Sequence, residues 1–150
     1  MIISDTIKYI GVDDTDLDLF EGQYVIPYGV SYNSYLIIDE RVAIMDSVDS
    51  RKQDEWLGNL DRELDGRTPD YLIVQHMEPD HAGSIAAAVE KYPQMKIIAS
   101  AKAVQMLPNF FSKVDFTNRT ISVKEGDTLS LGAHTLQFTA APMVHWPEVI

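Results

Sequence analysis

Two histidines and two carboxylates fall within six positions of the chain, at His76, Glu78, Asp80 and His81. Imidazole nitrogens and carboxylate oxygens suit zinc, iron or manganese, and their compact spacing lets several donors converge on one small volume. The alternative to a metal site is a solvated turn that carries two histidines by chance. Half of the chain's four histidines lie in this window, interleaved with acids, so the sequence predicts a mononuclear or dinuclear metal site.

A strand and a helix are expected on either side of these donors. Residues 71–74 are continuously apolar, as in a strand of a sheet that is covered by helices. Residues 82–92 are rich in alanine and end before Pro93, which predicts a helix. Open α/β sheets place their sites at the carboxyl ends of strands, so this position favours the metal-site interpretation.

Strand signals dominate both ends of the chain. Residues 7–12 predict an opening strand, and residues 33–38 and 42–45 predict a hairpin across a two-residue turn at Asp39 and Glu40. Between residues 120 and 139, three short strands separated by turn residues are expected to form further hairpins.

Two more helices are expected in the middle of the chain. Ser50 is a suitable N-cap for a helix that places Trp56, Leu60 and Leu64 on one face. Ser100 is the expected cap of a helix that runs toward Pro108. This order of elements predicts an α/β (α+β) fold with a mixed sheet and helices on one face.

Composition limits the class of protein. At 150 residues, with 45% hydrophobic and 23% charged residues, the chain is expected to form a single domain over residues 1–150. The formal charge of −11 argues against nucleic acid or an anionic membrane as a partner, because both need a positive surface. There is no cysteine, which excludes disulfides and thiolate ligands. No signal-like or membrane-spanning segment is found, so a cytoplasmic location is expected.

The donor motif and its surroundings resemble a known family. The pattern His76-x-Glu78-x-Asp80-His81 resembles the metallo-β-lactamase fold superfamily, most members of which have a histidine where Glu78 stands. With the glutamate, it is similar to the flavodiiron proteins, also called A-type flavoproteins. The runs at residues 27–37, 42–47 and 144–147 also resemble that family.

This resemblance implies a diiron centre that reduces dioxygen or nitric oxide with electrons from FMN. It implies that His76, Glu78 and His145 ligate one iron and that Asp80 and His81 ligate the other. Asp46 would then hydrogen-bond the ligand loop from outside the coordination sphere, although a simple turn aspartate is nearly as good an interpretation. His134 lies in a strand pattern and is interpreted as structural.

The resemblance covers only the first half of the metal domain of that family. A bridging aspartate, a further histidine, the second half of the αββα sandwich and the flavodoxin-like FMN domain have no counterpart in the 150 residues. We therefore expect a truncated flavodiiron-type oxidoreductase, inactive by itself, that holds one metal, iron or zinc, through His76, Glu78 and His145. FMN would belong to the missing domain.

Two alternatives to a flavodiiron-type protein stay open at this point. One is a hydrolase of the same superfamily, in which a metal-bound hydroxide attacks an ester, thioester or lactam. The other is a non-catalytic interaction module that retains the ligand loop. A half-sandwich would also expose one apolar sheet face, which predicts a homo-oligomer or a domain-swapped dimer; a monomer in light scattering would count against this.

Overall fold

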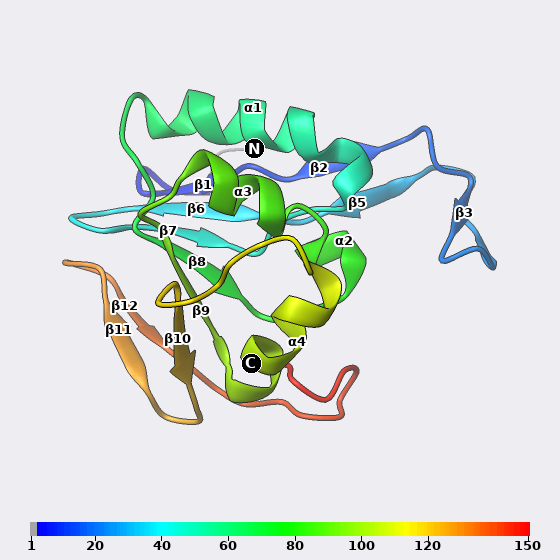
Figure 1. Cartoon of the computed structure of the whole chain (residues 1–150). Coiled ribbons are helices and arrows are strands. Elements are labelled where there is room, and N and C mark those ends of the chain that lie inside the picture. Colours follow the sequence, from blue (N-terminus) through cyan, green and yellow to red (C-terminus); the bar gives the residue numbers. More distant parts are fainter. Residues whose placement is uncertain (1–2) are drawn as a thin grey trace.

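A six-stranded mixed sheet forms the centre of the computed structural model, which describes residues 3–150 (Figure 1). Its strand order is β1-β6-β7-β8-β9-β10. The first three strands are antiparallel, and β7 through β10 are parallel. The strands of this sheet are β1 (Ile7–Tyr9), β6 (Tyr35–Ile38), β7 (Val42–Met45), β8 (Tyr71–Val74), β9 (Lys96–Ser100) and β10 (Thr120–Val123).

The helices pack on one face of this sheet (Figure 1). They are the 3-10 helix η1 (Ser50–Lys52) and the helices α1 (Gln53–Leu64), α2 (Pro79–Ala82), α3 (Ile85–Lys91) and α4 (Ala101–Phe110). Three small two-stranded sheets complete the fold: β2 (Val12–Asp14) with β5 (Val30–Tyr32), β3 (Leu19–Phe20) with β4 (Tyr24–Val25), and β11 (Thr128–Ser130) with β12 (Thr135–Gln137).

The alternating direction of side chains along the strands divides the buried residues into two apolar clusters, one on each face of the sheet. Successive strand side chains point to opposite faces, so Leu72 enters the cluster beneath the helices while Ile73 enters the cluster on the other face. Ile97 and Ile98 divide in the same way. The register pairs Leu72 with Ile97, which keeps the helix-side residues of neighbouring strands in contact. The expected mixed sheet with helices on one face is therefore confirmed.

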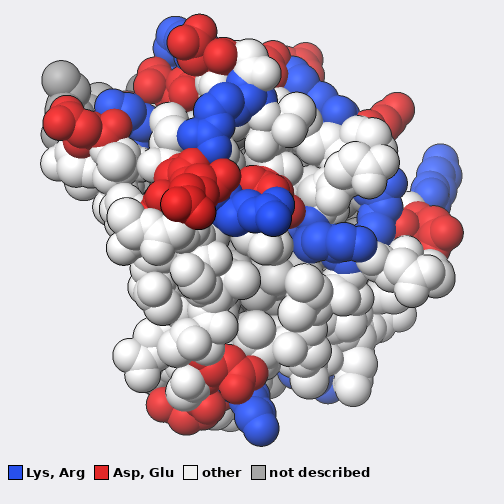
Figure 2. Space-filling model, turned by 90° about the vertical axis from the view of Figure 1, so that its left-hand side faces the viewer, with Lys and Arg blue, Asp and Glu red and all other residues white. Residues whose placement is uncertain are grey.

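The second face of the sheet is partly covered by the β11–β12 hairpin. Leu131 and Phe138, at the two ends of this hairpin region, are buried against Ile73 and Ile98. Figure 2 shows that charged side chains gather over the upper part of one side of the molecule and in a smaller group at its lower edge, with a mostly uncharged region between them. The apolar face that motivated the expectation of self-association is thus smaller than a bare half-sandwich would leave.

Two expectations about local structure are wrong. Ser50 does not cap α1: the carboxylate of Asp49 accepts the Arg51 N–H at 2.9 Å and caps η1, which leads into α1 at Gln53. The run at residues 120–123 does not join a hairpin, because β10 pairs in parallel with β9. Turn residues on both sides of that run suggested a local partner, but tertiary pairing at the sheet edge prevailed.

Candidate metal centre

The candidate site lies where three parallel strands end side by side. Asp46 follows β7, and Ser100 is the last residue of β9. The segment from Gln75 to His81, here called the ligand loop, follows β8 and runs into the first residues of α2. The Asp46 N–H donates to the Ile73 carbonyl at 2.9 Å, which extends the pairing of β7 and β8 to the edge of the site. Because carboxyl ends of neighbouring parallel strands share one edge, donors that are far apart in sequence meet there.

His76, Glu78 and His145 form one donor set. One ligand atom from each residue lies within 4.8 Å of the other two. Both imidazoles direct Nε2 at the same carboxylate oxygen, Glu78 Oε2, at 3.2 Å from His76 and 2.5 Å from His145. Two imidazoles and one carboxylate that converge in this way can hold a transition metal such as iron or zinc.

His145 reaches this set on a loop held by backbone hydrogen bonds. It lies 67 positions beyond Glu78. The Met143 N–H donates to the Trp146 carbonyl at 3.0 Å, and the Ile150 N–H donates to the Gln75 carbonyl at 3.0 Å. The second bond joins this loop to the residue that precedes His76.

Trp146 packs beside two of the candidate ligands. Its ring centroid lies 6.5 Å from that of His76 and 6.4 Å from that of His145. Tyr24 and Tyr28 are mostly exposed. Of these three aromatic residues, Trp146 is the one that lies beside the candidate histidines.

His81 lies between two carboxylates. Its Nε2 is 3.6 Å from Asp80 Oδ2, and its Nδ1 is 3.6 Å from Asp46 Oδ2. Asp46, His76 and His81 also offer ligand atoms within 4.8 Å of one another. Asp80 Oδ1 and His81 Nδ1 are buried without a hydrogen-bond partner among residues 3–150. Buried polar atoms of this kind need an explanation, and a cation beside them would provide one.

Asp46 is fixed to the ligand loop by two hydrogen bonds. Gln75 donates its backbone N–H to Oδ1 and its side-chain Nε2 to Oδ2, each at 2.8 Å. The backbone of Asp46 has φ of 55°, in the left-handed region that residues other than glycine adopt only when the surroundings hold them. Burial raises the pKa of this carboxyl group.

Gly83 lets the short helix α2 approach the backbone that follows β7. A Cβ atom at Gly83 would lie 2.6 Å from the Pro79 carbonyl oxygen and 2.7 Å from the Ser50 nitrogen. No real side chain tolerates such distances to backbone atoms. Close backbone packing therefore accounts for the glycine at this position, directly after the short helix that carries Asp80 and His81.

The electrostatics of the first donor set follow from these contacts. Burial tends to raise the pKa of Glu78, but hydrogen bonds from His145, Glu21 and His76 outweigh it, and the pKa is lowered. The same hydrogen bond, which His145 donates to Glu78, raises the pKa of His145. For Asp80, burial raises the pKa despite the nearby His81. Glu78 therefore carries its negative charge at neutral pH, as a metal ligand must.

A small pocket adjoins the donors. It has a volume of about 250 Å³ and is lined by Leu19, Phe20 and Glu21 of the β3–β4 hairpin and by Glu78 and Asp80 of the ligand loop, among others. Its walls are apolar and acidic apart from Arg51, and they include Glu78, whose carboxylate both histidines contact. A molecule of a few atoms could reach Glu78 through this pocket.

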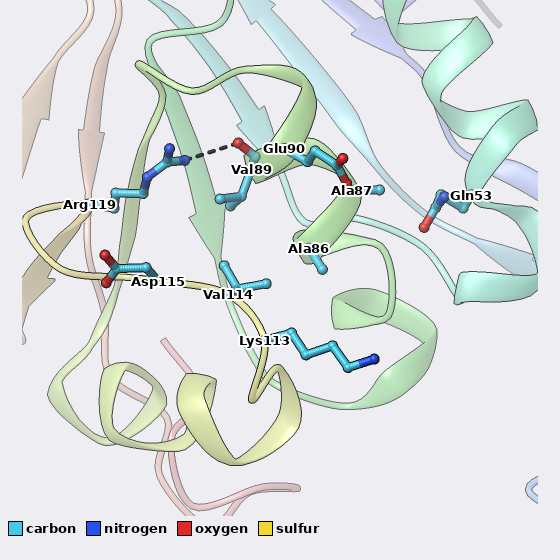
Figure 3. A pocket seen from close by; sticks show the side chains of 9 residues that line it. All are labelled: Gln53, Ala86, Ala87, Val89, Glu90, Lys113, Val114, Asp115 and Arg119. Carbon is cyan, nitrogen blue, oxygen red and sulfur yellow. Dashed lines mark hydrogen bonds between the residues drawn. The ribbon is translucent and has the colours of Figure 1, made fainter.

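A second cavity, of about 590 Å³, lies away from the donors between α3 and the loop at residues 113–119 (Figure 3). None of the expected metal ligands lines it. Its rim carries Lys113 and Arg119 but also Glu90 and Asp115, and Arg119 is engaged with the Val89 carbonyl at 3.0 Å. This balance of charge selects neither anions nor cations.

Two acidic residues near the donors were not singled out by the sequence. Glu148 is buried and accepts the Met77 N–H at 2.8 Å. Glu21 lies in the turn of the β3–β4 hairpin, and its hydrogen bond with Glu78 raises its pKa. Glu148 follows the His-Trp-Pro run that contains His145, but nothing in the local sequence marks either glutamate as a neighbour of the donors.

His134 lies at the opposite end of the sheet and makes structural contacts. Its Nδ1 is 2.6 Å from Asp39 Oδ2, and its Nε2 is 3.2 Å from Thr6 Oγ1. Asp39 comes from the β6–β7 turn, so the acidic neighbour that the local sequence lacks is supplied by the fold. The hydrogen bond from the His134 side chain, together with backbone N–H groups, holds the pKa of Asp39 well below its usual range.

The Asp39 pKa predicts how stability depends on pH. A carboxylate whose pKa is lowered by folding stabilises the native state above its unfolded pKa of about 3.9, and this stabilisation is lost as the pH falls toward the folded value. We expect Asp39→Asn to lower the melting temperature by a few degrees at pH 7, with a difference that shrinks below about pH 4. Melting curves across pH test this, with the exposed neighbour Glu40→Gln as control. A difference that grows on acidification would contradict the assignment.

Comparison with known proteins places the chain in a family. Residues 30–150 match the family model described as "ODP family beta lactamase". The chain belongs to this family. It is 37% identical over 147 residues to a nitric oxide reductase of Moorella thermoacetica and 39% identical over 147 residues to a flavo-diiron protein of Clostridium acetobutylicum. Each alignment covers 97% of this chain and 36% of the relative, so the chain spans about a third of the relatives' length.

Solved structures give the same result. The rubredoxin oxygen:oxidoreductase of Desulfovibrio gigas superposes with a TM-score of 0.91 at 34% identity, over 99% of this chain and 37% of that one. The flavodiiron protein of Giardia intestinalis superposes with a TM-score of 0.88 at 28% identity, over 98% of this chain and 35% of that one. The resemblance to the metallo-β-lactamase-like part of flavodiiron proteins is thus confirmed. Within residues 3–150, no helix has both the length and the apolar composition needed to cross a bilayer.

Proposed function

We propose that this chain is the metal-binding part of a flavodiiron-type oxidoreductase that acts on dioxygen or nitric oxide. The observation that carries the proposal is the convergence of His76, Glu78 and His145, whose ligand atoms lie within 4.8 Å of one another. Two histidines and one carboxylate with open positions are typical of non-haem iron sites that handle dioxygen. The relatives named as nitric oxide reductase and oxygen oxidoreductase support the same chemistry.

The residues of the first donor set have distinct roles in this proposal. His76 and His145 would offer neutral Nε2 atoms, and Glu78 would offer a negative oxygen that favours the more oxidised metal. A bound iron would supply the site at which dioxygen or nitric oxide is reduced. Trp146 packs beside His76, and the small pocket of about 250 Å³ adjoins Glu78, so a diatomic substrate is small enough to reach this set.

The second iron would be held by Asp80 and His81. In this arrangement His81 Nε2 faces Asp80, the other proposed ligand, while His81 Nδ1 faces Asp46. A carboxylate on the far nitrogen fixes the orientation and the tautomer of a ligating histidine. Asp46 is therefore proposed as the group that orients His81. With two donors only, this second position binds its metal more weakly than the first, and FMN would reside outside the stretch of relatives that this chain spans.

Metal analysis tests the proposal. Purified chain that is loaded with iron(II) under anaerobic conditions and then desalted should retain about one equivalent of metal, because the two groups of three donors share His76 and cannot both be complete. Plasma mass spectrometry against protein concentration gives the ratio. Two tightly bound equivalents would contradict the single-metal expectation, and no retained metal would contradict the site as a whole.

A further inference from the structure

Glu148 is a buried carboxylate beside the candidate metal centre that belongs to neither donor set. Its residue is only 2% exposed. Oε1 accepts the Met77 N–H at 2.8 Å, whereas Oε2 is buried without a hydrogen-bond partner among the described residues. Burial of a carboxylate costs free energy unless the group forms strong interactions, so its presence here calls for a role.

Among the described residues, the side-chain hydrogen bond of Glu148 connects the two segments that carry the donors. Met77 stands between His76 and Glu78, and Glu148 stands three positions after His145. The bond from Met77 N–H to Glu148 thus spans 71 positions and joins the ligand loop to the His145 loop. A second hydrogen bond joins the same two segments on the other side of His76: the Ile150 N–H donates to the Gln75 carbonyl at 3.0 Å.

The backbone of Glu148 is anchored to the sheet as well. Its carbonyl accepts the Ser100 hydroxyl at 2.8 Å, at the carboxyl end of β9. Glu148 therefore connects three structures: the end of β9, the ligand loop after β8 and the His145 loop. Its side chain and backbone together define where the His145 loop crosses the edge of the sheet.

The His145 loop needs such an anchor because the residues around the histidine make few contacts. Met143 and Val144 are 76% and 80% exposed, and the His145 side chain is 57% exposed. A segment with so little burial opens at low free-energy cost. A metal ligand, however, has to be held within roughly 0.5 Å of its productive position.

We propose that Glu148 is a positioning residue of the metal centre. By accepting the Met77 N–H, it holds the His145 loop against the ligand loop, so that His145 Nε2 meets Glu78 and His76 in one coordination sphere. The inference rests on the proposed metal-binding function. It adds a residue outside the donor motif on which metal affinity depends.

Cobalt(II) binding provides a direct test, because its visible absorption reports on the ligands of the bound ion. Glu148→Ala removes the acceptor, while Glu148→Gln keeps a carbonyl oxygen at the Oε1 position. Loss of a group that orients a ligand costs about 10- to 100-fold in metal affinity. We expect Glu148→Ala to bind cobalt(II) that much more weakly with an altered spectrum, and Glu148→Gln to remain within a few-fold of the unchanged chain.

Amide exchange supplies a readout that does not depend on metal. In the metal-free protein, the Met77 amide should exchange slowly in the unchanged chain and in Glu148→Gln, and faster in Glu148→Ala, because the acceptor is gone. Glu148→Met keeps the side-chain volume without an acceptor. If the alanine variant does not fold, Glu148→Met should show the same weaker cobalt(II) binding and the same faster exchange of the Met77 amide.

Asp39→Ala is the matched control. It also removes a buried carboxylate that accepts backbone N–H groups, but at the opposite end of the sheet. It should reduce stability and leave cobalt(II) affinity unchanged. Equal affinity losses in Glu148→Ala and Asp39→Ala, or none in Glu148→Ala, would overturn the positioning role. Absence of cobalt(II) binding by the unchanged chain would instead overturn the metal centre, and this inference with it.

Discussion

Replacing His145 with alanine should abolish tight metal binding. The side chain supplies one of three donors in the set with His76 and Glu78. Removal of a group that only orients a ligand costs about 10- to 100-fold in metal affinity, so removal of the ligand itself should cost more than about 100-fold. Titration with iron(II) or zinc(II) under anaerobic conditions measures the change.

The fold should tolerate this substitution. The His145 side chain is 57% exposed, so little packing is lost, and a change in affinity can be assigned to the donor. His134→Ala is the control, because it removes the same residue type from the opposite end of the sheet, where it contacts Asp39. If both variants retained metal as the unchanged chain does, His145 would not be a ligand.

Replacing Trp56 with alanine should cause the largest loss of stability. Trp56 is fully buried in the cluster beneath the helices. Its Nε1 donates to Ser34 Oγ at 3.0 Å, and the Ser34 hydroxyl donates to the Asp46 carbonyl at 2.8 Å. Truncation of a buried tryptophan costs about 3–5 kcal/mol. In a chain of this size the melting temperature should fall by about 6–20 °C.

The contributions of the indole hydrogen bond and of the buried ring to stability can be measured separately. Trp56→Phe keeps most of the buried ring and removes the indole donor, so it should cost less than the alanine variant. Tyr28→Ala, at a side chain that is 92% exposed, should change the melting temperature little. Equal melting temperatures for Trp56→Ala and the unchanged chain would show that α1 is not packed as described.

Local sequence patterns were sufficient for the elements that form by local rules. The hairpin of β6 and β7, the apolar strand β8 and the cap of α4 at Ser100 depend on alternation, burial or a neighbouring N–H. The parallel pairing of β10 with β9 was missed, because its partner lies more than twenty positions away and turn residues suggested a nearer one. Long-range pairing leaves a weak trace in a single sequence.

The ligand loop could be recognised from the sequence because its donors are close together along the chain. His76, Glu78, Asp80 and His81 share one short loop, so their chemistry is visible without the fold. Glu148 was missed because a glutamate gives no sign of burial until the partner N–H of Met77 is placed beside it. A role for Asp46 beside the ligand loop was suggested only by the family resemblance, and its own local sequence could not show that Gln75 and His81 contact its oxygens.

Anomalous diffraction at the iron edge tests the central claim most directly. Crystals of the iron-loaded chain, measured on both sides of the absorption edge, locate the metal without assumptions about its ligands. We predict the strongest peak within about 2.0–2.3 Å of His76 Nε2, His145 Nε2 and a Glu78 oxygen. A strongest peak between Asp46 and His81, or no peak at the carboxyl ends of the parallel strands, would contradict the account.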